Sequence, residues 1–225
     1  MRRRSGLDIP QTLADACDPA AMALIVYDMQ AGVLRQLADG GAGAVQRVSR
    51  VLAAARAGGY PVFFTRHTSL PVRLMGTAQL RTAMAWQRVD DPEKVESWFL
   101  PGAPGSQIVA ELAPRADEAV FDKLAMSAFA GTPLEMALRD LGIRAFAVAG
   151  VALEIGIAPT IWHAVDLGVI PVVVTDACGG RDQPAMRRVL DDFRFSGDTL
   201  LTDIATITPL LANPPEDVSN TGNFR

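Results

Sequence analysis

The sequence predicts a doubly wound α/β domain, in which helices cover both faces of a mainly parallel, six-stranded, Rossmann-like sheet. Short apolar runs without polar alternation recur along the chain, which is typical of parallel strands buried on both faces. Longer segments with helical spacing separate these runs, and right-handed crossovers place such helices on both faces of a sheet. The 225 residues suffice for one domain of this kind with a substantial core.

The apolar runs and the periodic segments assign the elements in order. Six runs rich in β-branched and aromatic residues are predicted strands, at residues 21–28, 61–67, 118–123, 144–151, 170–177 and, with a turn, 198–207. Four segments have helical spacing, at residues 41–60, 132–142, 153–168 and 183–195. Gly58 and Gly59 end the first of these helices, Gly142 is a C-terminal cap, and Pro159 is tolerable because it lies early in its helix.

The segments outside this pattern are a long loop and two ends. Residues 68–104 are predicted to be irregular, and a loop of that length in a compact domain is usually functional or a lid. We expect residues 21–211 to form the domain. Residues 1–20 are predicted to be a solvated tail, because no apolar region follows the basic start, and residues 212–225 are predicted to be a flexible tail.

The composition excludes several classes of binding partner. A net charge of −4 and a pI near 5.2 disfavour a non-specific nucleic-acid binder. No stretch approaches the roughly 18 uninterrupted apolar residues of a membrane span. Two cysteines cannot form a disulfide framework, which favours a reducing cytoplasm, and no spacing requires a metal or an organic cofactor. We therefore expect a small-molecule substrate, and neither a nucleic acid nor a membrane as partner.

Ligands of such sheets bind beyond the carboxyl ends of the strands, so residues at these ends are the candidates. Asp28 ends the first strand, where a partly desolvated carboxylate suits general acid or base catalysis, although a helix N-cap is equally compatible with the position. Lys123 ends the third strand and could stabilise charge on a substrate, or simply be exposed. His67 is a substrate-facing or structural residue without the spacing of a metal site.

Four further residues have a functional and a structural interpretation. The first turn after residue 151 offers unpaired N–H groups to an anion, and Gly156 lets a ligand approach the backbone, whereas Glu154 could merely complement the helix dipole. Cys178 is a thiol near the carboxyl edge, but a free cysteine is often just a small buried hydrophobe. Trp86 could wall a pocket, anchor its loop or fill a subunit interface.

Taken together, residues 22–204 resemble the isochorismatase-like hydrolase superfamily. ALIVYDMQAGV looks like the family's first strand with its catalytic Asp and the DMQ signature, AVFDKLAMSAFAGTPLEMALRDLGIRAFAVAGV like the segment with the catalytic Lys, and VTDACGG like the end of the fifth strand. The resemblance implies catalytic positions at Asp28, Lys123 and Gly156. It also implies a cis peptide at Val151–Ala152, and N–H groups of Ala152 and Gly156 directed at an oxyanion.

The resemblance further suggests how this chain departs from its family. In the cysteine-hydrolase branch the nucleophilic Cys stands where this chain has Gly156, whereas isochorismatases proper also carry Gly there. Glu154 replaces the usual His of the isochorismatase turn, and Ile161 follows Thr160 in place of the usual Arg, so we hypothesise a neutral or cationic substrate. We expect the substrate to contact a set of positions comprising Gln30, His67, Trp86, Phe129, Ala152 and Glu154.

These observations predict a hydrolase that cleaves a vinyl ether or a C–N bond by acid/base chemistry, without a covalent thioester. Glu154 is a second group that could activate water. The alternatives are a cysteine amidase that uses Cys178 and a catalytically inactive ligand-binding or scaffold protein. The family commonly assembles as dimers or tetramers, so a homodimer or homotetramer is expected.

Overall fold

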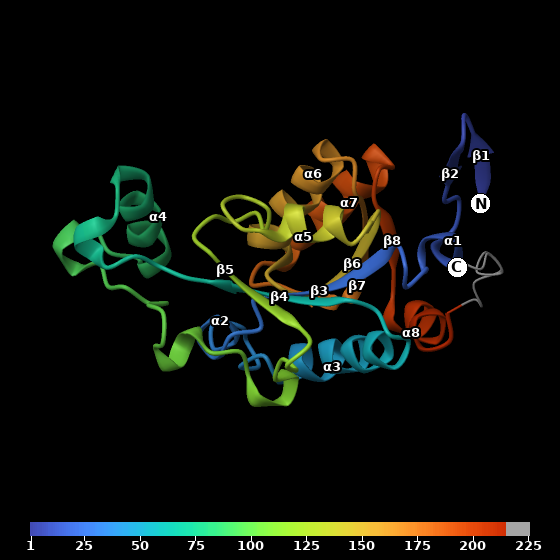
Figure 1. Ribbon diagram of the computed structural model, residues 1–225. Coiled ribbons are helices and arrows are strands. Elements are labelled where there is room, and N and C mark those ends of the chain that lie inside the picture. The colour runs from blue at the N-terminus through green and yellow to red at the C-terminus, as the bar shows by residue number, and fades with distance from the viewer. Residues whose placement is uncertain (215–225) are drawn as a thin grey trace.

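The computed structural model describes residues 1–214 and contains one parallel six-stranded sheet with helices on both faces (Figure 1). The strand order is β5-β4-β3-β6-β7-β8, and every neighbouring pair is parallel. The strands are β3 (Met22–Tyr27), β4 (Val62–His67), β5 (Ala119–Lys123), β6 (Ala145–Val151), β7 (Ile170–Gly179) and β8 (Leu200–Thr202). The predicted fold class is confirmed.

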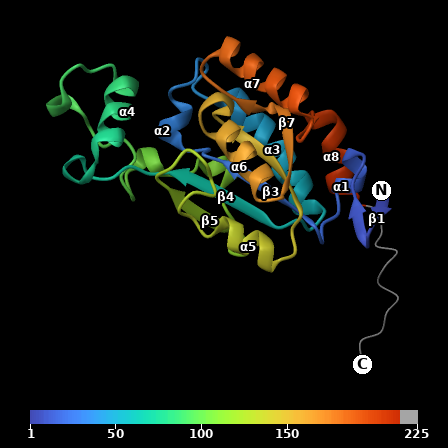
Figure 2. The same ribbon diagram turned by 90° about the horizontal axis from the view of Figure 1, so that it is seen from above.

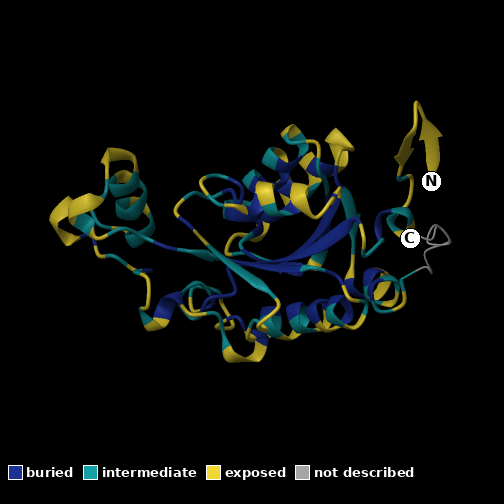
Figure 3. Ribbon diagram, viewed as in Figure 1, coloured by how far each residue is buried: buried dark blue, intermediate teal, exposed yellow. Residues whose placement is uncertain are grey.

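The two faces of the sheet have separate apolar cores. All residues of β3 and β6 are buried, which is why these strands read as continuous apolar runs. Helices α3 (Ala42–Ala57) and α8 (Ile204–Ala212) pack on one face (Figure 1). Helices α5 (Leu134–Asp140), α6 (Ala158–Asp166) and α7 (Gln183–Ser196) pack on the other. Figure 3 shows the resulting buried sheet between partly exposed helices.

The chain begins β3 in the middle of the sheet and moves outward through β4 to β5. It then returns to the other side of β3 with β6 and continues outward through β7 to β8. The direction therefore reverses between β3 and β6, which makes their carboxyl ends the topological switch point. Short helix α2 (Ala31–Leu34) follows β3 at this edge, and a π-helical turn (Leu153–Ile157) follows β6.

The segment predicted to be irregular contains a helix. Helix α4 (Thr77–Gln87) and three-residue 3-10 turns at Val72–Leu74 and Pro92–Lys94 lie within residues 68–104, which we call the arm. Two further 3-10 turns, Pro104–Ser106 and Ala110–Leu112, lead back to β5. No residue of α4 is buried, so the helix has no apolar stripe that a sequence pattern could reveal. Figures 1 and 2 show the arm projecting from the body beside β4.

The ends of the chain also differ from the prediction. Residues 1–20 are not simply a tail, because they form an exposed hairpin of β1 (Arg2–Arg4) and β2 (Leu7–Ile9), followed by α1 (Leu13–Ala16), whose last residue is buried. The final strand is only three residues long, and Asp203 then caps α8, where a turn was predicted. Most of the predicted tail at 212–225 lies outside the described residues.

No helix within residues 1–214 has both the length and the apolar character needed to cross a membrane.

Candidate active site

A buried ion pair lies at the switch point of the sheet. Asp28 follows the last residue of β3 and has a left-handed backbone (φ 46°), and Lys123 is the last residue of β5. Lys123 Nζ lies 2.7 Å from Asp28 Oδ2, and Thr65 Oγ1, from the intervening strand β4, donates to Asp28 Oδ1 at 2.6 Å. The residues of the pair are only 6% and 3% exposed, so each charge depends on the other.

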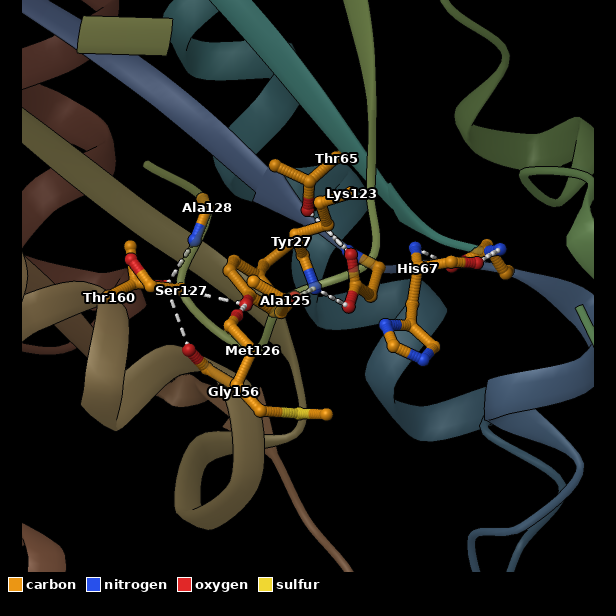
Figure 4. A network of polar contacts seen from close by, with 12 residues as sticks. Tyr27, Thr65, His67, Lys123, Ala125, Met126, Ser127, Ala128, Gly156 and Thr160 are labelled. Atoms are coloured by element: carbon orange, nitrogen blue, oxygen red, sulfur yellow. Dashed lines mark hydrogen bonds and ion pairs between the residues drawn. The ribbon is translucent and has the colours of Figure 1, made fainter. Parts of the chain in front are cut away.

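Lys123 has two more partners that fix its position (Figure 4). Its Nζ lies 4.6 Å from the centre of the Tyr27 ring and 3.4 Å from the carbonyl oxygen of Ala125. A cation over an aromatic face is attracted by the ring quadrupole. The ammonium is therefore held between a carboxylate, a carbonyl and a ring.

The turn after β6 faces this pair. The expected cis peptide bond at Val151–Ala152 is present. The N–H groups of Ile155, Gly156 and Ile157 all donate to the carbonyl oxygen of Ala152, at 3.3, 3.0 and 3.1 Å. The N–H of Gly156 is thus used inside the turn and is not directed at an oxyanion, in contrast to the expectation from the family resemblance.

A small cavity of about 60 Å³ opens between the ion pair and this turn, and we call it the inner cavity. Of the predicted site residues it is lined by Asp28, His67, Trp86, Lys123, Ala152 and Gly156. The carboxyl ends of β3, β4 and β5 and the turn after β6 therefore bring together residues that lie more than 120 positions apart in the sequence.

Outside the strand ends and the turn after β6, sequence reasoning missed six residues of the inner cavity, which are Val33, Gln36, Leu37, Phe99, Met126 and Arg181. Phe99 and Met126 are apolar residues in irregular segments, and nothing in the sequence distinguishes them. Arg181 lies two residues beyond the carboxyl end of β7, where the sequence analysis had singled out only Cys178. Following the same edge by two further residues would have found it.

Three predicted contact residues are not among those that line the inner cavity. Gln30 is completely buried and acts as a backbone clamp: its side-chain oxygen accepts the N–H of His67 at 2.7 Å, and its amide donates to the carbonyl oxygens of His67 and Ser106. Phe129 lies in the core against Phe146. Both residues support the site rather than contact its cavity.

Glu154 is the third of these residues, and it holds a loop. Its Oε1 accepts the backbone N–H groups of Arg181 and Asp182 at 2.7 and 3.2 Å. Gly180 makes this approach possible, since a Cβ there would lie 2.1 Å from Oε2. One oxygen of Glu154 thus binds the loop that carries Arg181, the other is buried without a hydrogen-bond partner among the described residues, and Glu154 does not line the inner cavity. This removes the premise on which a neutral or cationic substrate was hypothesised.

The two histidines have different surroundings. Burial, and secondly the charge of Lys123, lower the pKa of His67 to about 4, so its ring is neutral at pH 7. The ring lies edge-on to Trp86 and Phe99, with which it lines the inner cavity. His163 instead bonds through Nδ1 to Ser127 Oγ at 2.9 Å and packs on Phe129, away from the cavity lining.

Neither of the two thiols lies at the inner cavity. Cys178 is buried in the core, where its S–H donates to the carbonyl oxygen of Val148 at 3.5 Å. Burial raises the pKa of its thiol to about 12, which leaves almost no nucleophilic thiolate at neutral pH. Cys17 lies in the core of the opposite face, and burial raises its pKa to about 11. Within residues 1–214, no cluster of three or more acidic, His or Cys side chains is arranged to hold a metal.

A second, larger cavity adjoins the first. It measures about 190 Å³, and we call it the arm cavity because α4 and the rest of the arm supply most of its lining, including Leu70, Gln79 and Trp98. The two cavities share four lining residues, which are His67, Trp86, Phe99 and Met126. Trp86 and His67 thus belong to a common wall between the buried ion pair and the arm.

The family match and the similar proteins of known sequence all indicate the same family. Residues 22–204 match the Isochorismatase domain. An isochorismatase family protein of Escherichia coli, YecD, is 34% identical over 163 residues, which cover 69% of this chain and 78% of that protein. The ureidoacrylate amidohydrolase RutB of Variovorax paradoxus is 27% identical over 195 residues, 78% of this chain and 77% of that protein.

The solved structures agree. An isochorismatase family protein of Desulfovibrio vulgaris superposes with a TM-score of 0.71 at 28% identity, covering 86% of this chain and 99% of that one. The matched region contains the whole six-stranded sheet and both residues of the buried ion pair. The chain therefore belongs to the isochorismatase family and is a hydrolase.

Proposed function

We propose that this protein hydrolyses a small molecule by direct attack of water, without a covalent thioester, and that Asp28 moves the proton while Lys123 stabilises charge. One observation carries the proposal. The inner cavity contains the complete Asp28–Lys123 pair, but the position that the family resemblance assigns to the nucleophile is Gly156, and both thiols of the chain are buried elsewhere.

The hydrogen bonds of Asp28 favour a general base. Both of its oxygens accept, one from Thr65 and one from Lys123, which suits an ionised carboxylate. Asp28 takes a proton from water, and the water oxygen forms a bond to the electrophilic carbon of the substrate. The C–N bond then breaks, and Asp28 returns the proton to the departing nitrogen. Lys123 stabilises the negative charge that develops on the substrate oxygen.

C–N cleavage fits this protonation state better than vinyl-ether cleavage. A vinyl ether must first be protonated on carbon, which requires a neutral Asp28, whereas the structure surrounds this carboxylate with two donors. The name of the matched ureidoacrylate amidohydrolase also supports a C–N bond. Because the charges of Asp28 and Lys123 cancel, Arg181 leaves the cavity lining net positive, which favours a substrate with an anionic group.

The alternative of a cysteine amidase is disfavoured by the position of Cys178, and a variant lacking both cysteines tests it directly. We expect the Cys17→Ala, Cys178→Ala double variant to hydrolyse a panel of ureido acids, primary amides and vinyl ethers at the wild-type rate. Intact-protein mass spectra of samples quenched during turnover should show only the unmodified chain. An acyl adduct on any residue, or loss of turnover in the cysteine-free variant, would overturn the proposal. Failure of wild type to turn over any probe would favour the binding-protein alternative.

A further inference from the structure

The space beside Gly156 is occupied by one aromatic side chain. Tyr27 is the last residue of β3, lies directly before Asp28 and is completely buried. A Cβ built on Gly156 would lie 2.7 Å from both Cε1 and the hydroxyl oxygen of Tyr27, and 3.0 Å from Cζ. Real Cβ atoms essentially never approach another atom so closely. Any side chain at position 156 therefore requires the Tyr27 ring to move.

The Tyr27 ring is held in place by hydrogen bonds (Figure 4). Its hydroxyl donates to the carbonyl oxygen of Met126 and lies 3.3 Å from Thr160 Oγ1. Thr160 Oγ1 in turn lies 2.8 Å from the carbonyl oxygen of Gly156 and accepts the N–H of Ala128 at 3.0 Å. Burial raises the pKa of Tyr27 well above its usual value, so the hydroxyl remains a donor. The ring cannot swing aside without breaking this network.

The same ring also contacts the catalytic pair. Lys123 Nζ lies over its face, 4.6 Å from the ring centre, while its edge lies against Gly156. One side chain thus links the cation of the ion pair to the position that the family resemblance assigns to the nucleophile. A smaller residue at position 27 would make room at position 156 and would also remove the surface on which the ammonium rests.

We infer that Tyr27 and Gly156 are a coupled pair: the Tyr27 ring fills the volume of a nucleophilic side chain, and the same ring positions Lys123 towards Asp28. Tyr27 is a positioning residue and does not contact the inner cavity. Converting this chain to a cysteine hydrolase therefore needs two substitutions, a cysteine at position 156 and a small residue at position 27. The inference rests on the proposed function only for the role of position 156.

A double-mutant cycle tests the steric half of the inference, namely that the Tyr27 ring fills the volume beside Gly156. We expect Gly156→Cys to lower the melting temperature and the soluble yield sharply. Adding Tyr27→Val should restore stability beyond the sum of the single effects, because neighbouring residues with a shared volume are not additive. Gly76→Cys is the matched control, since Gly76 has an ordinary φ of −79° and nothing within 4 Å of a Cβ, and it should melt like wild type.

The thiol in these variants gives a second measurement. In the folded Tyr27→Val, Gly156→Cys protein the space left by the ring should join the inner cavity, because Gly156 and Lys123, which flank the ring, both line it. Iodoacetamide should then label position 156, whereas Cys17 and Cys178 are buried. The steric half is overturned if Gly156→Cys alone melts like wild type, or if the cycle is additive. These results do not depend on turnover, so they separate failure of this inference from failure of the proposed function.

The positioning half of the inference, namely that the Tyr27 ring positions Lys123, has a spectroscopic test that needs no substrate. The sequence contains two lysines, Lys94 and Lys123, and Lys94 is exposed. The Tyr27 ring current should therefore displace one of two lysine Cε–H signals in an NMR spectrum of ¹³C-lysine-labelled protein. Tyr27→Phe keeps the ring and should keep the displacement, whereas Tyr27→Leu should move the Lys123 signal to that of Lys94. A Lys123 signal that is not displaced in wild type, or that is unchanged in Tyr27→Leu, would overturn the positioning role.

Discussion

The two adjoining cavities share a wall but are built in opposite ways. The inner cavity lies at the carboxyl ends of buried strands, and its charged pair has three further partners, which are Thr65 in the sheet, the carbonyl oxygen of Ala125 and the ring of Tyr27. The arm cavity is lined mainly by a segment whose helix α4 buries no residue. Figure 3 shows the same contrast between the dark strands in the middle of the sheet and the arm, which consists mainly of intermediate and exposed residues. On the proposed function, the groups that carry out the chemistry are thus held by the core, and the surface offered to the rest of the substrate lies on a loop.

The largest expected effect comes from removing one charge of the ion pair that lines the inner cavity. Asp28→Asn should lower turnover by about 10²- to 10⁴-fold, the usual contribution of a general acid or base. It should also destabilise the protein by about 3–5 kcal/mol, because Lys123 would keep a buried charge without its partner. Steady-state kinetics and urea unfolding measure the two effects.

The matched control removes both charges at once. Asp28→Asn combined with Lys123→Met should regain most of the stability, because no unpaired charge is left, but it should regain none of the activity. Turnover near the wild-type rate in either variant would show that the ion pair is structural and that the chemistry lies elsewhere.

The contribution of His67, in the wall shared by the two cavities, to the stability of the protein should depend on pH. The pKa of His67 is lowered from 6.5 to about 4, so the unfolded chain binds this proton more readily than the folded one. Stability from this group is fully present above pH 6.5 and is lost as the pH falls towards 4, by up to about 3 kcal/mol. Urea unfolding of wild type and His67→Gln at pH 7 and pH 4.5 measures it as the difference between the two proteins.

His163→Gln is the control for this experiment, because His163 lies on α6 away from both cavities. Its stability should fall with pH as that of wild type does. If His67→Gln loses as much stability between pH 7 and 4.5 as wild type, the ring of His67 is not desolvated in the folded protein.

The smallest effect on the kinetic constants is expected from a substitution in the arm, at the wall that the two cavities share. Trp86→Ala should raise KM about tenfold and change kcat by less than about threefold, since it removes apolar contact to the substrate but leaves the ion pair intact. Trp162→Ala, at an exposed position of α6, should leave both constants unchanged. A fall in kcat with unchanged KM for Trp86→Ala would contradict this division between chemistry and binding.

The edge residues could be predicted because parallel strands bring their carboxyl ends together. That rule alone selected Asp28, His67 and Lys123, which lie within one cavity although 95 positions separate the first from the last. The apolar runs of β3 and β6 were unambiguous because both faces of these strands are covered. Here local pattern and tertiary position agree.

Other features depend on contacts that no local pattern records. Helix α4 was missed because it has no buried side, and α8 because Pro209 lies inside it. The direction of Glu154 is set by the return of the loop at Arg181, 27 residues later. The crowding of Gly156 by Tyr27 links positions 129 residues apart. Assembly as a dimer or tetramer stays a prediction.

The amide of Gln30 has a consequence for how this protein could change over time. It fixes the backbone at His67, where the arm departs, and at Ser106, where the arm has returned. Between these two anchored points the chain can be lengthened, shortened or rewritten while the strand ends beneath it stay in register. One buried side chain thereby holds both ends of the arm, and an insertion or deletion within the arm would leave these two attachment points in place.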